Sequence, residues 1–158
     1  MWDFEAKVLG IPVRNSLSVR KPHPLTTAYT LSLGTPDEMA DAARAASNRP
    51  LLKVKVGGEG DLERLRAVAA AAPNSKIILD ANEGWTDQNV AQNIEAAAAL
   101  GVVLIEQPLP AGKDSILRKF IHAVPICADE SAHDSEGLAG LKGLYDAVNI
   151  KLDKAGGL

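Results

Sequence analysis

From residue 28 onward, short apolar runs alternate with longer segments in which apolar residues recur every three or four positions. The short runs are typical of buried strands, and the longer segments are typical of amphipathic helices. The pattern predicts six strands, at residues 28–33, 51–56, 76–79, 102–105, 126–128 and 147–150. It predicts five helices between them, at residues 36–46, 61–71, 87–100, 115–123 and 135–144.

Residues that favour helix ends support these boundaries. Thr35 followed by Pro36 is a start signal, because threonine caps the first turn and proline fits its first position. Thr86 stands in the same place before the third predicted helix. Gly101 follows the last residue of that helix, where a left-handed glycine often ends a helix.

Strands that alternate with helices predict a parallel sheet covered by helices, because a parallel return needs a long crossover connection. Two α/β architectures share this pattern, a doubly wound open sheet and a (β/α)8 barrel. A nucleotide-binding open sheet needs a phosphate loop, and the glycines of residues 57–60 are the candidate. Glu59, Asp61 and Glu63 place carboxylates there, and the spacing does not complete GxGxxG, so we reject a phosphate site.

Composition and charge exclude several classes of protein. The 158 residues include 17 basic and 20 acidic side chains, and the formal charge of −3 argues against a polycationic binder of nucleic acid or membrane. No apolar run approaches the ~18 residues that span a bilayer. The first residues lack the apolar core of a secretory signal, and Cys127 is the one cysteine. We expect a cytoplasmic globular protein without nucleic-acid or membrane partners.

Charged residues recur at the carboxyl ends of the predicted strands, with one position per strand–helix unit. They are Lys53 and Lys55 on the second strand, Asp80 after the third, Glu106 after the fourth, Asp129 after the fifth and Lys151 after the sixth. In a barrel these positions converge on one mouth, where the active sites of that fold lie. This convergence favours the barrel over the open sheet.

Asp80, Glu106 and Asp129 form an all-oxygen set without histidine or cysteine. Such a set suits a hard divalent cation, above all Mg²⁺, and without a cation three adjacent carboxylates would repel one another. Each acid alone has an ordinary alternative, as a helix cap or as a solvated loop residue. The three together, at matched strand ends, favour a shared metal site.

Lys53 and Lys55 alternate with aliphatic residues on the second strand, so both ammonium groups share one face. In a barrel the aliphatic face meets the helices and the lysines point inward; a solvated edge strand is the alternative. Two adjacent buried cations should lower the pKa of each other, as a general base requires. Lys55 and Lys151 would then flank the α-carbon of a bound carboxylate substrate, so that one removes a proton and the other delivers one to the opposite face.

Five motifs resemble the muconate-lactonizing subgroup of the enolase superfamily: KVK at 53–55, DAN at 80–82, IEQP at 105–108, ADES at 128–131 and NIKLDKAGG at 149–157. Within that subgroup the chain is similar to dipeptide epimerases of the L-Ala-D/L-Glu type, which act in murein peptide recycling. A lysine base combined with Mg²⁺ is a known property of this superfamily, and for this chain it is an implication of the resemblance.

The resemblance implies a role for each candidate residue. Asp80, Glu106 and Asp129 would bind Mg²⁺, Lys55 and Lys151 would be the acid/base pair, and Lys53 would assist electrostatically. Thr27 and Asn82 would lie near a small dipeptide substrate, although Asn82 is also a typical turn residue. His23, His122 and His133 have no place in this mechanism.

A complete barrel takes ~250 residues, so the resemblance implies a partial (β/α)8 barrel of about six strands. We assign residues 1–24 to a remnant capping-domain helix and lead-in, and residues 25–158 to the barrel. Strands seven and eight and most of the capping domain would be missing, and we expect this fragment to be inactive alone. The parent enzyme could be a homo-oligomer.

Three functions are consistent with these observations. The first is a Mg²⁺-dependent dipeptide epimerase that acts by two-base proton transfer through an enolate. The second keeps the same site but resembles o-succinylbenzoate synthase or muconate cycloisomerase. The third is a non-catalytic barrel fragment that needs a partner.

Overall fold

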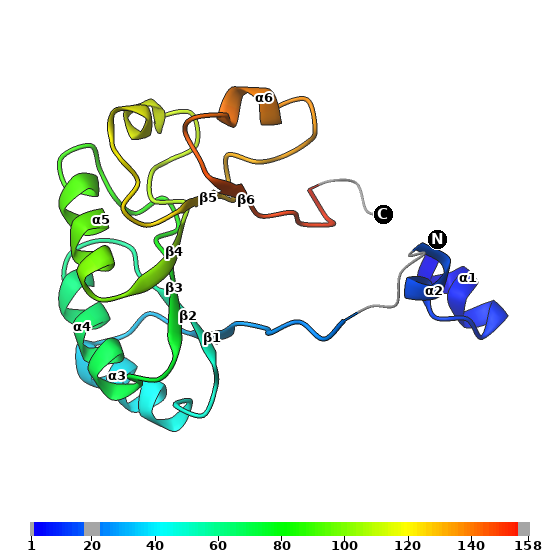
Figure 1. The fold of residues 1–158 in the computed structure, drawn as a ribbon, viewed down its shortest axis with the longest axis horizontal. Coiled ribbons are helices and arrows are strands. Elements are labelled where there is room, and N and C mark those ends of the chain that lie inside the picture. The colour runs from blue at the N-terminus through cyan, green and yellow to red at the C-terminus, as the bar shows by residue number, and fades with distance from the viewer. Residues whose placement is uncertain (1, 18–22, 155–158) are drawn as a thin grey trace.

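The computed structural model describes residues 2–17 and 23–154. Six strands and the helices between them alternate along the chain (Figure 1). The strands are β1 Tyr29–Leu31, β2 Leu51–Lys55, β3 Lys76–Asp80, β4 Val102–Glu106, β5 Ile126–Ala128 and β6 Ala147–Val148. The helices are α1 Trp2–Leu9, α2 Val13–Leu17, α3 Pro36–Ala45, α4 Asp61–Ala71, α5 Val90–Ala99, the 3-10 helix η1 Ser115–Lys119 and α6 Leu138–Leu141.

All neighbouring strands pair in parallel, and their order in the sheet is their order in the chain, from β1 to β6. A doubly wound sheet would reverse direction at a switch point, whereas a barrel adds each strand beside the previous one. The observed order therefore confirms the barrel type of α/β fold. Helices α3, α4 and α5 cover one face of the sheet, and the other face is open in this view (Figure 1).

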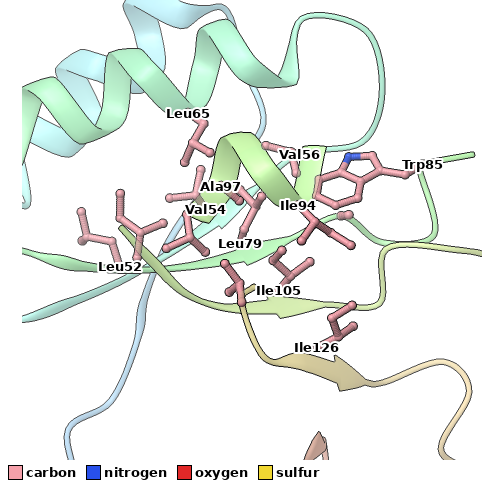
Figure 2. Close-up of a cluster of buried hydrophobic side chains, with 14 of the residues drawn as sticks. Leu52, Val54, Val56, Leu65, Leu79, Trp85, Ile94, Ala97, Ile105 and Ile126 are labelled. Atoms are coloured by element: carbon pink, nitrogen blue, oxygen red, sulfur yellow. The ribbon is translucent and has the colours of Figure 1, made fainter. Parts of the chain in front are cut away.

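The hydrophobic core lies between the sheet and these helices (Figure 2). On β2, Leu52 and Val54 are fully buried, while the lysines that alternate with them are on the opposite face. Leu79, Ile105 and Ile126 continue this apolar layer across the neighbouring strands. The prediction that the aliphatic side of β2 meets the helices is correct.

The predicted strands agree with the structure to within about two residues, but the last two helices are shorter than predicted. The segment 115–123 contains only η1, because the carbonyl of Leu117 accepts hydrogen bonds from the Phe120 N–H (3.2 Å) and the His122 ring (3.1 Å). In a continuing α-helix that carbonyl would bond the N–H four residues later. The segment 135–144 contains three glycines, which disfavour helix, and only α6 forms.

The third predicted helix starts later than expected. The Asn89 side chain accepts a hydrogen bond from the Thr86 N–H (2.8 Å), so residues 86–89 form a turn and α5 begins at Val90. Gly101 has a φ of +74° directly after this helix, as predicted for a left-handed helix end. The Thr35 cap of α3 is also confirmed, and Glu38 completes a capping box with it.

The amino-terminal helix expected within residues 1–10 is present as α1, and none of its described residues is buried. The expected lead-in includes α2, and residues 18–22 lie outside the described part of the chain. Among the described residues, no helix has both the length and the apolar character that crossing a membrane requires.

Candidate active site

Lys53 and Lys55 point to the sheet face that the helices leave open, where they meet acids from β3 and β4. The Nζ atom of Lys53 lies 2.9 Å from Asp80 Oδ2 and 2.6 Å from Glu106 Oε2. The Nζ atom of Lys55 lies 2.8 Å from the same Asp80 oxygen. Strand register explains these contacts, because Lys55 is opposite Asp80 and Asp80 is opposite Glu106.

Asp129 and Lys151 form the second half of the cluster, after β5 and β6. The Nζ atom of Lys151 lies 2.6 Å from Asp129 Oδ2. The two halves are linked through Asn149, whose Nδ2 donates a hydrogen bond of 3.0 Å to Glu106 Oε1. Asp80, Glu106 and Asp129 are only 1, 4 and 2% exposed. The structure thus gathers the predicted acids and lysines at one end of the sheet.

Ion pairing shifts the pKa values of this cluster. Burial lowers the pKa of Lys53, but hydrogen bonds and charges from Asp80 and Glu106 raise it more, so the net shift is upward. The hydrogen bond with Asp129 raises the pKa of Lys151 against a smaller opposing effect of burial. Burial raises the pKa of Asp129, but the hydrogen bonds and charges of Lys151 and Lys154 together outweigh burial, so the net shift is downward.

The expectation that the two lysines of β2 lower the pKa of each other is therefore wrong for Lys53. Carboxylates of the neighbouring strands bond directly to its ammonium group, and together they outweigh the effect of burial. The same ion pairs add a contact that the sequence pattern did not predict, because each of the three carboxylates lies beside at least one lysine ammonium group.

The two predicted substrate-binding residues differ in their positions. Asn82 belongs to the cluster: its Oδ1 accepts a hydrogen bond of 2.7 Å from Lys55, and its φ of +44° is typical of a turn asparagine. Thr27 is exposed ahead of β1, and no hydrogen bond joins its side chain to the cluster within the described residues. Its role stays a prediction.

The histidines lie away from this chemistry. His122, ahead of β5, contacts Asp146, ahead of β6, and the Leu117 carbonyl, and His23 and His133 are exposed. Cys127 is buried, and burial followed by the charges of Glu106 and Asp129 raises its pKa to about 11, so it stays a thiol.

In the glycine loop after β2, residues 57–60, the side chain of Asp61 accepts hydrogen bonds from the loop's own backbone. The N–H groups of Gly57 and Gly58 donate to Asp61, at 3.1 and 2.8 Å, and Trp85 Nε1 donates to the same carboxylate at 2.9 Å. These N–H groups are therefore occupied, which supports the rejection of a phosphate site. Gly84 packs directly against this loop. Only glycine fits there, because a Cβ at this position would lie 2.6 Å from the Cα of Gly57.

Comparison with known proteins places this site in a family. Residues 37–158 match the family described as "Enolase C-terminal domain-like". The chain belongs to this family. The match confirms the family predicted from the sequence. The parallel sheet in barrel order confirms the predicted partial barrel.

Two curated relatives in this enolase-like family match the whole chain. The chain is 48% identical to the N-acetyl-D-glutamate racemase of Pseudoalteromonas sp and 43% identical to the L-Ala-D/L-Glu epimerase of Escherichia coli K12. In both cases the match covers 100% of this chain and 50% of the relative. The chain therefore spans about half the length of the curated relatives it matches.

Solved structures of enolase-family proteins agree with the fold. A protein from Agrobacterium tumefaciens, described as having homology to dipeptide epimerases and as bound to sodium and L-Ala-L-Glu, is 54% identical with a TM-score of 0.94. The match covers 99% of this chain and 48% of that one. The dipeptide epimerase of Cytophaga hutchinsonii, described as a complex with Mg and D-Ala-L-Val, is 31% identical with a TM-score of 0.89 over 99% and 45% of the two chains.

The donor set of the site fits the divalent cation that this enolase-like family implies. Asp80, Glu106 and Asp129 offer only carboxylate oxygens, are almost fully buried and follow three consecutive strands. As they stand, each contacts at least one ammonium group. Within residues 2–17 and 23–154, no three acid, histidine or cysteine side chains converge closely enough to hold an ion. A cation would have to replace the lysine contacts.

Three residues of this enolase-like site were not predicted from the sequence: Lys154, Asn149 and Glu130. Lys154 Nζ lies 2.7 Å from Asp129 Oδ1 and 2.6 Å from the Asp129 carbonyl. Asn149 joins Glu106 as described above, and Glu130 accepts from Asn82 Nδ2 at 3.4 Å. A signal for Asn149 existed in the sequence, because it stands two residues before Lys151 at the end of the predicted sixth strand, and residues two apart on an extended chain point the same way. Nothing in the spacing indicated Lys154 or Glu130.

Proposed function

We propose that this chain carries the acid/base machinery of an epimerase that acts on dipeptides of the L-Ala-D/L-Glu type. The observation that carries the proposal is the arrangement of Lys55 and Lys151 at opposite ends of one cluster of buried carboxylates. Relatives named L-Ala-D/L-Glu epimerase and a neighbour solved with L-Ala-L-Glu support this substrate class. Murein peptide recycling in the cytoplasm is the corresponding expected role.

Asp80, Glu106 and Asp129 would hold Mg²⁺ in this proposal. When bound, the ion would hold the substrate carboxylate and neutralise the negative charge that builds on it as the α-carbon loses its proton. A neighbouring structure described with Mg and a dipeptide supports this assignment, and another is described with sodium and a dipeptide.

The two lysines would perform the proton transfers. With its amine neutral, Lys55 takes the α-proton, and the electron pair of the broken C–H bond enters the substrate carboxylate as an enolate. Lys151, as an ammonium, donates its proton to the opposite face of the same carbon, which inverts the stereocentre. Lys53 stays charged beside them, consistent with its raised pKa, and stabilises the developing negative charge.

Substitution of Lys151 tests this two-base scheme in the complete polypeptide that carries the sequence. We expect Lys151→Ala to abolish epimerization of L-Ala-L-Glu, while the α-proton of one epimer still exchanges with D₂O through Lys55. Proton NMR of both epimers in D₂O measures this difference. Lys119→Ala, at an exposed lysine at the end of η1, is the matched control and should behave as the unmodified protein. Equal loss of exchange from both epimers would contradict the scheme.

A second substrate is favoured by one observation. The relative from Pseudoalteromonas sp is named for N-acetyl-D-glutamate, and it is more similar to this chain than the Escherichia coli epimerase is. Both substrates are glutamates acylated at nitrogen, so the same lysines and carboxylates serve either. The ratio of kcat/KM for L-Ala-L-Glu and N-acetyl-glutamate distinguishes the two, because only the dipeptide has a free amino group to recognise.

The division of the chain is also part of the proposal. We assign residues 1–24 to the capping-domain remnant and lead-in and residues 25–158 to the partial barrel. The absence of buried residues among the described part of α1 and the start of the parallel sheet at β1 support this boundary. The synthase or cycloisomerase alternative has less support, because the curated relatives described above are a racemase and an epimerase.

A further inference from the structure

Gln107, the residue directly after Glu106, has a fully buried side chain at the end of β4. Its φ is +34°, in the left-handed region that residues other than glycine rarely adopt. Such strain persists only where the surrounding structure holds it in place. The contacts of its side-chain amide identify what holds this residue.

The amide of Gln107 uses all of its hydrogen-bonding capacity. Its Oε1 accepts from the backbone N–H groups of Asp129 (2.8 Å) and Ser131 (3.1 Å). Its Nε2 lies 2.8 Å from the Leu109 carbonyl, 2.8 Å from Ser131 Oγ and 2.9 Å from Tyr145 Oη. The two backbone donors fix which end of the amide is oxygen, because only the oxygen can accept.

The buried carboxylate of Asp114 sets the direction of this network. Its Oδ2 accepts from Ser131 Oγ (2.7 Å) and from Tyr145 Oη (2.6 Å). Burial, followed by the hydrogen bond to Asp114, raises the pKa of Tyr145, so its hydroxyl keeps its proton. Because both hydroxyls donate to Asp114, their oxygens act as acceptors and share the one Nε2 hydrogen of Gln107 that the Leu109 carbonyl leaves. The network thus joins the loops that follow β4 and β5 to the segment before β6.

The side-chain hydrogen bonds of Gln107 continue the link between β4 and β5 beyond the last main-chain hydrogen bond of this strand pair. Pairing between β4 and β5 stops at Glu106 and Cys127, with a last bond from the Gln107 N–H to the Cys127 carbonyl (2.9 Å). Asp129 lies two residues beyond that point. The bond from Gln107 Oε1 to its N–H therefore replaces a ladder bond, and it fixes the main chain of Asp129 relative to Glu106.

We propose that Gln107 is a positioning residue that sets the separation of Glu106 and Asp129 and thereby the affinity of the site for a divalent cation. The proposal rests on the function proposed above insofar as these two acids bind the cation. It assigns no contact between Gln107 and substrate or metal. Groups that orient metal ligands in this way typically contribute about 10- to 100-fold in affinity.

Gln107→Met tests the proposal in the complete polypeptide, because it keeps the length of the side chain and removes both hydrogen-bonding ends. Without added metal, we expect amide hydrogen exchange at Asp129 and Ser131 to become about tenfold faster, while amides in α4 are unchanged. In calorimetric titration with MgCl₂, we expect the Kd to rise by about 10- to 100-fold. Val68→Ala, in the core of α4 and remote from the site, is the control for general destabilisation.

Each outcome decides a different question. If the unmodified protein binds no Mg²⁺, the proposed function fails and this inference fails with it. If it binds Mg²⁺ but Gln107→Met has unchanged affinity, or if Val68→Ala weakens binding equally, only the inference fails. Tyr145→Phe keeps the ring in place and removes one partner of Gln107, so a smaller loss of about threefold is expected should Gln107→Met not fold. Unchanged affinity in a folded Tyr145→Phe would then contradict the inference.

Discussion

At the scale of single residues, the site depends on carboxylates that are paired before any ligand binds. Lys53 bridges Asp80 and Glu106, while Lys151 and Lys154 share Asp129. Removing one partner of such a buried pair leaves an uncompensated charge, so these groups hold the strand ends together whatever their part in the proposed reaction. A bound cation would exchange with ammonium groups rather than enter an unbalanced cluster of acids.

Asp61 shows how strongly one buried carboxylate supports the loop that follows Lys55. It accepts hydrogen bonds from Gly57, Gly58 and Trp85, and Asp61→Ala would leave these donors without a partner. We expect a loss of about 3 kcal/mol in the free energy of unfolding, measured by urea denaturation. Glu63→Ala is the control, because Glu63 is an exposed acid in the same helical turn. Equal effects of the two substitutions would show that the Asp61 contacts do not support the loop.

The sequence identified the acids and lysines of the site because their spacing repeats once per strand. It did not identify Gln107, Lys154 or Glu130, since their partners lie in other loops and no periodicity relates them. The pKa of Lys53 was predicted in the wrong direction for a related reason. The neighbouring lysine on the same strand is visible in the sequence, whereas the acids beside Lys53 are brought there by the register of other strands.

At the scale of elements, the strands and helices α3 and α4 agree with their predicted ranges because burial on one face imposes a clear period. The later helices were overestimated. Hydrophobic spacing in 115–123 and 135–144 indicated helix, but side-chain hydrogen bonds and glycines end the helices early. A pattern that counts only apolar positions does not include these side-chain hydrogen bonds, which compete with the hydrogen bonds of the helix.

Helix α3 offers a test of a predicted cap. The Thr35 backbone and side chain donate to Glu38, and these bonds lower its pKa below the ordinary 4.5. A lowered folded-state pKa contributes stability above the ordinary value and loses it as the pH falls through the lowered value. We expect Thr35→Ala to cost about 1 kcal/mol at pH 7, to raise the pKa of Glu38 in an NMR titration, and to cost less in acid.

Thr86→Ala is the matched control for this cap. Thr86 also precedes a predicted helix, but in the structure its N–H donates to Asn89 and its hydroxyl caps no helix in the described residues. We expect its substitution to change the free energy of unfolding by no more than about 0.5 kcal/mol. A cost as large as that of Thr35→Ala would mean that loss of the threonine itself, rather than loss of the cap, explains both results.

At the scale of the whole molecule, helices α3, α4 and α5 leave the sheet face with the candidate site uncovered (Figure 1). The described strands run from β1 to β6 without pairing of β6 with β1, so each of these two strands keeps an unpaired edge in the described part of the chain. The side chains of Lys55 and Lys151 are 33 and 40% exposed. An enolate forms readily only where water is excluded and fixed charges replace it, so the proposed reaction needs this face to be covered.

We therefore expect the 158-residue chain alone not to epimerize L-Ala-L-Glu, because water reaches both lysines of the proposed acid/base pair. Loss of the substrate α-proton signal in D₂O, with MgCl₂ present, measures the reaction, and the Escherichia coli L-Ala-D/L-Glu epimerase is the positive control. Circular dichroism and calorimetry with MgCl₂ on the same sample separate an open site from an unfolded chain. Turnover by the isolated chain would show that its six strands suffice, and that closure of the barrel serves stability rather than catalysis.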